Sequence, residues 1–164
     1  MTNPFQKSAD ALVEGLAEIA GERDRARQAA EAERRERERS FERATACFAA
    51  VAAKVEECLA LANEAFHGSA VTLASKVVPI SSTAGAITVT LSGEGMAPAS
   101  FRIVGNASFK LYVHELADPK YGPFDLSDAE ALPYGEMVEQ LIRNATAKLR
   151  EPAGGEAGDR GQGR

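Results

Sequence analysis

Apolar residues in the first 67 positions are spaced as on one face of an α-helix. They recur at three-, four- and seven-residue steps, which favours an amphipathic helix over a strand. Residues 22–43 carry alternating Arg and Glu without Gly or Pro, so the helical pattern is not interrupted. We therefore predict one helix over about residues 4–67, which at 1.5 Å per residue is roughly 95 Å long. The apolar positions on its face are Leu12, Leu16, Ile19, Phe41, Phe48, Val51, Val55, Leu59 and Phe66.

This predicted helix is too long to bury its apolar face within a small domain. We expect it to dimerise as a coiled coil through the nine apolar positions, and the sequence does not choose between parallel and antiparallel chains. The segment 22–43 puts mostly Arg, Glu and Ala at the interface positions, so we interpret it as a spacer. The stripe from Phe41 to Phe66 is wider than a coiled-coil seam, which indicates that it also touches a globular domain. Gly21 leaves open a break that would give a separate helix over residues 4–20.

From residue 70 to 115 the pattern changes to a period of two, which is typical of strands with one buried face. The clearest example sets Ile87, Val89 and Leu91 against Thr and Ser between them. We predict four strands joined by short links, and hence an antiparallel meander. Gly105-Asn106 is a pair suited to the turn of the last hairpin.

The C-terminal part predicts a loop, a helix and a tail. Asp118-Pro119 and Gly122-Pro123 mark the loop, and a second apolar stripe predicts a helix over about 133–150 that packs on the sheet. Residues 151–164 are rich in Gly and contain no large apolar side chain that could anchor them, so we predict a disordered tail. The predicted fold class is α+β, with a long helical segment (1–67), a small head (68–150) and the tail.

Composition adds limits rather than a function. The 164 residues have a net charge of −5, and no region is strongly basic, so non-specific nucleic-acid binding is not favoured. No signal peptide or membrane-length apolar run is visible, and we expect a cytoplasmic protein. Cys47 and Cys58 are eleven residues apart on the predicted helix, about 16 Å, and cannot bridge within one chain.

No set of residues predicts catalysis, a metal or a cofactor. His67 and His114 are the only histidines. The spacing of Cys47, Cys58 and His67 is too wide for zinc. Gly93-Glu94-Gly95 follows a strand, but it lacks the third Gly and the following helix of a nucleotide loop. We therefore expect a protein that is not an enzyme and needs no cofactor.

One predicted surface is a candidate for binding. The outward side chains of the strands include Arg102, Lys110, Tyr112 and His114, a mixture of cations and aromatic rings. An acidic peptide or a nucleic acid could contact such a face, although an ordinary solvent-exposed face has the same composition. The leading hypothesis is a scaffold or adaptor that dimerises through the helix and binds a protein partner through the head. The alternative is a module that binds a ligand or nucleic acid on the polar sheet face.

Overall fold

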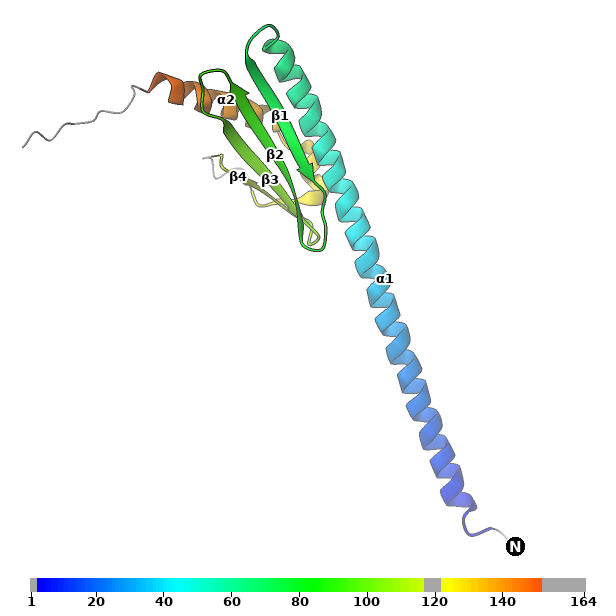
Figure 1. Cartoon of the computed structure of the whole chain (residues 1–164). Coiled ribbons are helices and arrows are strands. Elements are labelled where there is room, and N and C mark those ends of the chain that lie inside the picture. Colours follow the sequence, from blue (N-terminus) through cyan, green and yellow to red (C-terminus); the bar gives the residue numbers. More distant parts are fainter. Residues whose placement is uncertain (1–2, 117–121, 152–164) are drawn as a thin grey trace, which may run out of the picture. The chain divides into compact units, whose positions relative to one another are not determined.

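The computed structural model describes residues 3–116 and 122–151, and the fold is α+β, as the sequence predicts (Figure 1). It divides into two compact units between Arg43 and Ala44, and α1 contributes to both. The elements in chain order are α1 (Gln6–Ala65), β1 (Val71–Val78), β2 (Ala84–Gly93), β3 (Ala99–Asn106), β4 (Lys110–His114), β5 (Phe124–Asp125), the 3₁₀-helix η1 (Leu126–Ala131) and α2 (Tyr134–Arg150).

The first unit consists of the N-terminal part of α1. Asn3 caps this helix, because its side-chain oxygen accepts a hydrogen bond from the Phe5 N–H at 3.0 Å. The helix continues through Gly21 without a break. Side chains four residues apart form ion pairs along its charged segment, among them Glu31–Arg35 at 2.6 Å. Such exposed pairs each support the helix by a few tenths of a kcal/mol, about 0.3–0.5.

The second unit contains one antiparallel sheet, whose strands follow the order β1-β2-β3-β4-β5. This is the predicted meander, but the described residues form five strands rather than four. The additional strand, β5, has only two residues, and it pairs Phe124 with Leu111 at the edge of the sheet. Two residues are too few to show a period of two, so the sequence pattern could not predict this strand.

The hairpin between β3 and β4 also differs from the prediction. β3 continues through Gly105 and Asn106, and Gly105 pairs with Leu111 on β4. The chain turns at residues 107–109 instead, where the Asn106 side chain accepts hydrogen bonds from the N–H groups of Ser108 and Lys110, both at 3.0 Å. Gly105 is needed for space and not for a turn. A Cβ atom added there would lie 2.5 Å from Cδ2 of Phe48.

The core of the second unit lies between one face of the sheet and two helices. The inward positions of the strands alternate with exposed or half-buried ones, as along β2. The C-terminal part of α1 and residues 134–145 of α2 supply the opposing apolar side chains, so both helices cover the same face (Figure 1). The fully buried helical residues are Ala44, Phe48, Val51, Val55 and Leu59 of α1, and Tyr134, Met137, Val138, Leu141 and Ala145 of α2.

The end of α1 also protects the free edge of β1. The helix ends at Ala65, and Gly68 adopts a positive φ of 79° just after it, as expected for a helix stop. The Asn63 amide both donates to the C=O of Leu73 and accepts from its N–H, each at 2.8 Å. These bonds satisfy backbone groups that would otherwise remain open on an edge strand.

Two of the sequence predictions concern residues outside the described part of the chain. The loop predicted at Asp118-Pro119 lies within residues 117–121, and nearly all of the predicted tail lies within residues 152–164. Both therefore stay predictions.

Candidate interaction surfaces

The apolar stripe near the N-terminus is exposed to solvent. Leu12, Leu16 and Ile19 have 64, 58 and 49% of their surface accessible, although their spacing places them along one line of the helix. Phe5 lies seven residues before Leu12 and is also exposed, and Val13 borders the same stripe. Sequence reasoning missed Phe5, although its seven-residue spacing to Leu12 was a usable signal. Large apolar side chains that recur on one exposed face indicate a surface that a partner covers.

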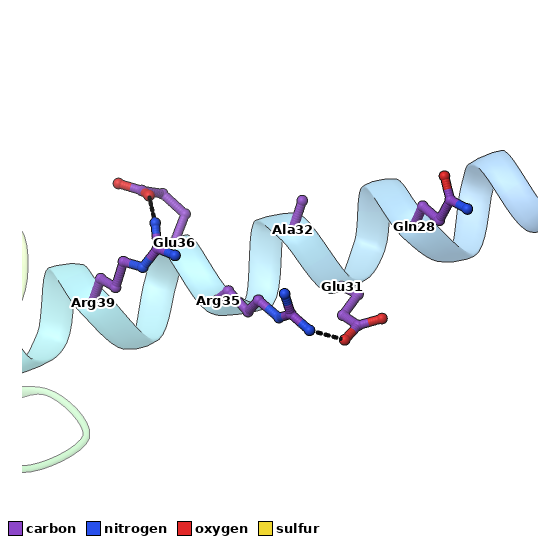
Figure 2. Close-up of a pocket in the computed structure, with 6 residues that line it drawn as sticks. All are labelled: Gln28, Glu31, Ala32, Arg35, Glu36 and Arg39. Carbon is purple, nitrogen blue, oxygen red and sulfur yellow. Dashed lines mark hydrogen bonds and ion pairs between the residues drawn. The ribbon is translucent and has the colours of Figure 1, made fainter.

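The charged segment that follows offers no comparable surface. Figure 2 shows its central part, where Gln28, Ala32 and Glu36 alternate with Glu31, Arg35 and Arg39 along one helix. Arg35 pairs with Glu31 at 2.6 Å and Arg39 with Glu36 at 3.9 Å, so the charges compensate one another locally. The hollow between these side chains is lined by a single helix, so a ligand placed there would be contacted from one side only. That the segment acts as a spacer stays a prediction.

The apolar residues predicted between Phe41 and Phe66 have a different environment from those near the N-terminus. Phe48, Val51, Val55 and Leu59 are at most 2% exposed within a single chain, because they pack on the inner face of its own sheet. Phe66 is half-buried against the same core, and Phe41 is 37% exposed. The four buried side chains cannot form an interface between helices unless the core of the second unit comes apart. Of the predicted interface residues, Leu12, Leu16, Ile19 and Phe41 are therefore the ones accessible to a partner.

The outer face of the sheet, turned away from both helices, carries two parallel rows of side chains. The strand register places Lys76, Thr88, Arg102 and His114 side by side across β1 to β4. Two residues further along each strand, the register places an apolar row, whose members are Val78, Ala86, Val104 and Tyr112. The structure thus brings together the four predicted face residues Arg102, Lys110, Tyr112 and His114, and it adds Lys76, which sequence reasoning did not include.

The cations of this face are not neutralised by the described residues. Lys76, Arg102 and Lys110 are exposed, and none of them forms an ion pair with a described residue. Asp125 lies opposite Lys110, but its carboxylate accepts hydrogen bonds from the N–H and the hydroxyl of Ser127. Tyr112 and His114 stack, with their ring centroids 6.3 Å apart. The face therefore combines net positive charge with exposed apolar and aromatic surface.

The titratable groups whose pKa is perturbed lie inside the second unit and not on this face. Burial raises the pKa of the Tyr134 phenol, whose hydroxyl donates to the C=O of Ala129 at 2.5 Å. Burial also raises the pKa of the Cys58 thiol, and the neighbouring carboxylate of Glu57 adds to this increase. Within residues 3–116 and 122–151, no group of three or more His, Cys, Asp or Glu side chains is placed to hold a metal ion.

In the described part of the chain, no helix combines the length and the apolar character that crossing a membrane requires. The sequence and the structure were also compared with models of protein families, with curated proteins and with solved structures. None of the three comparisons finds a match to this chain.

Proposed function

We propose that the protein is a non-enzymatic scaffold or adaptor, which dimerises through the N-terminal part of α1 and binds a protein partner through the second unit. The observation that carries this proposal is the exposed stripe of Leu12, Leu16 and Ile19. Within the first unit these side chains have no core to enter, because the unit consists of one helix. A second copy of the same stripe buries them at a seam of the coiled-coil type.

The extent of the stripe sets the strength of the association. It covers about two heptads from Phe5 to Ile19, and the positions that continue it through the spacer include Arg23, Glu33 and Arg37. Two-heptad seams bury little area, so the dimer should be weak enough to dissociate on dilution. The two free cysteines, Cys47 and Cys58, agree with a location in the reducing cytoplasm, which is part of the proposal.

A charge placed within the stripe tests the proposal. Leu16→Glu puts a carboxylate at the seam of both chains, and we expect the dissociation constant of the dimer to rise at least about tenfold. Ala11→Glu is the matched control, because it adds the same charge outside the apolar stripe. Sedimentation equilibrium measures both variants. Equal dimerisation of Leu16→Glu and Ala11→Glu would contradict the proposed interface.

A further inference from the structure

The outer sheet face has an apolar strip that is bordered by Lys76 and Arg102 on one side and by Lys110 on the other. Along β4, Tyr112 stands two residues from Lys110 in one direction and two residues from His114 in the other. The same alternation on β1 and β3 places Lys76 and Arg102 beside Val78 and Val104. Residues two apart on a strand are separated by about 6.6 Å, so the cations border the strip at that distance.

The dimensions of the strip match a short helix. It crosses four strands that lie about 4.8 Å apart, and is therefore roughly 15 Å long, the length of about ten helical residues. Along β4, the two positions that flank the strip, Lys110 and His114, are four residues and therefore about 13 Å apart, which is close to the 10–12 Å diameter of a helix with its side chains. A helix seated on Val78, Val104 and Tyr112 would bring the side chains on its flanks next to the cations.

We infer that this face binds an acidic amphipathic helix of a partner protein, with an apolar stripe that is bordered by Asp or Glu on both sides. The inference rests on the proposed function, and it names the class of partner that the head recognises. Charge complementarity carries it, because Lys76, Arg102 and Lys110 have no ion-pair partner among the described residues. An acidic flank supplies the missing counter-charges, while the apolar stripe covers Val78 and Tyr112.

A peptide fits this surface better than a nucleic acid does. Single-stranded nucleic acids bind to grooves of strong positive potential with several aromatic platforms. Here the exposed aromatic surface is Tyr112 stacked on His114, and most of the remaining strip is aliphatic. The net charge of −5 on the whole chain also opposes the approach of a polyanion more than that of a short peptide.

The test uses the full chain and a labelled peptide of about 15 residues, which forms a helix with a Leu stripe bordered by Glu on both sides. A second peptide has Lys in place of every Glu. Fluorescence anisotropy should show saturable binding of the Glu peptide and none of the Lys peptide. Raising NaCl from about 50 to 300 mM should weaken the binding severalfold, since the contacts lie at the rim of the interface.

Two variants locate the binding on the sheet face. Arg102→Glu and Val104→Glu should each raise the Kd of the Glu peptide by about tenfold or more. The first variant removes a counter-charge, and the second removes part of the apolar strip. Lys7→Glu is the control. It changes the charge by the same amount as Arg102→Glu, but it lies on the part of α1 that belongs to the first unit, and it should change the affinity for the Glu peptide less than twofold. Circular dichroism of each variant confirms that the fold is intact.

Three results would overturn the inference. The first is no binding of the Glu peptide at about 1 mM, which would leave the face an ordinary solvated surface. The second is equal binding by Arg102→Glu and the unmodified chain. The third is that the chain binds a single-stranded RNA oligonucleotide more tightly than the peptide, and that Arg102→Glu abolishes this RNA binding. The mass of the unliganded chain, measured on the same samples, separates these failures from a failure of the proposed dimer.

Discussion

Replacement of Gly105 by Ala tests the packing of α1 on the sheet. The new Cβ atom would lie 2.5 Å from Cδ2 and 2.8 Å from Cε2 of the Phe48 ring, where ordinary contacts begin at about 3.4 Å. Both residues are buried, and Phe48 is only 2% exposed, so its ring can shift only toward the apolar cavity of about 160 Å³ that it lines with Ala52, Val77 and Ile80. The atoms must separate by roughly 1 Å, and overpacking of this kind costs about 1–3 kcal/mol of unfolding free energy.

Urea unfolding followed by circular dichroism measures this loss as a lower midpoint with an unchanged slope. Gly135→Ala is the matched control, because no heavy atom beyond its chain neighbours and its own helix backbone lies within 4 Å of the added Cβ, and Ala favours the helix by up to about 1 kcal/mol. Phe48→Leu should remove part of the clash, so the double variant should lose less stability than the sum of the two single variants. A Gly105→Ala protein as stable as the unmodified chain would refute the close approach of Phe48 to β3.

Three smaller predictions follow from other contacts. Asn63→Ala removes both hydrogen bonds to the Leu73 backbone and should lower the unfolding free energy by about 1–3 kcal/mol in the same urea assay; no change would show that water replaces the amide without cost. Gly21→Ala should increase the helical signal at 222 nm and raise helix stability by up to about 1 kcal/mol, because α1 is continuous there; a decrease would indicate a break at Gly21. Since its pKa is raised, the Cys58 thiol should react with iodoacetamide more slowly than free glutathione at pH 8, and its rate should keep rising above the pH where glutathione levels off; equal pH profiles would contradict the effect of burial.

The fold class could be predicted because most elements leave a periodic signal. The alternation of Ile87, Val89 and Leu91 predicted a strand whose inward residues are buried, and Pro133 and the stripe after it predicted α2 to within one residue. The turn between β3 and β4 was predicted at the wrong residues, because glycine is common both in turns and at crowded positions inside strands. Gly105 resembles a turn residue in the sequence, but it stands inside β3 because the Phe48 ring occupies the place of its side chain.

The candidate surfaces were predictable only in part, for a similar reason. A helical stripe shows which residues share a face, but not whether that face packs on the same chain or on another. Val51 and Leu12 look alike in the sequence, yet Val51 is buried by the sheet and Leu12 is exposed. The cationic face was predicted more fully, because period-two alternation assigns Arg102 and His114 to one side of their strands. Lys76 was missed because the pairing of β1 with β2 had to be known first.

The mass of the unmodified full chain in solution tests the central claim most directly. Sedimentation equilibrium over about 1–100 μM separates a weak dimer from a monomer, because the dimer fraction rises with concentration. We predict that the average mass rises toward twice the chain mass of 17.4 kDa at the upper end of this concentration range. A mass of 17.4 kDa at every concentration would contradict the account, since Leu12, Leu16 and Ile19 would then stay exposed without a second copy.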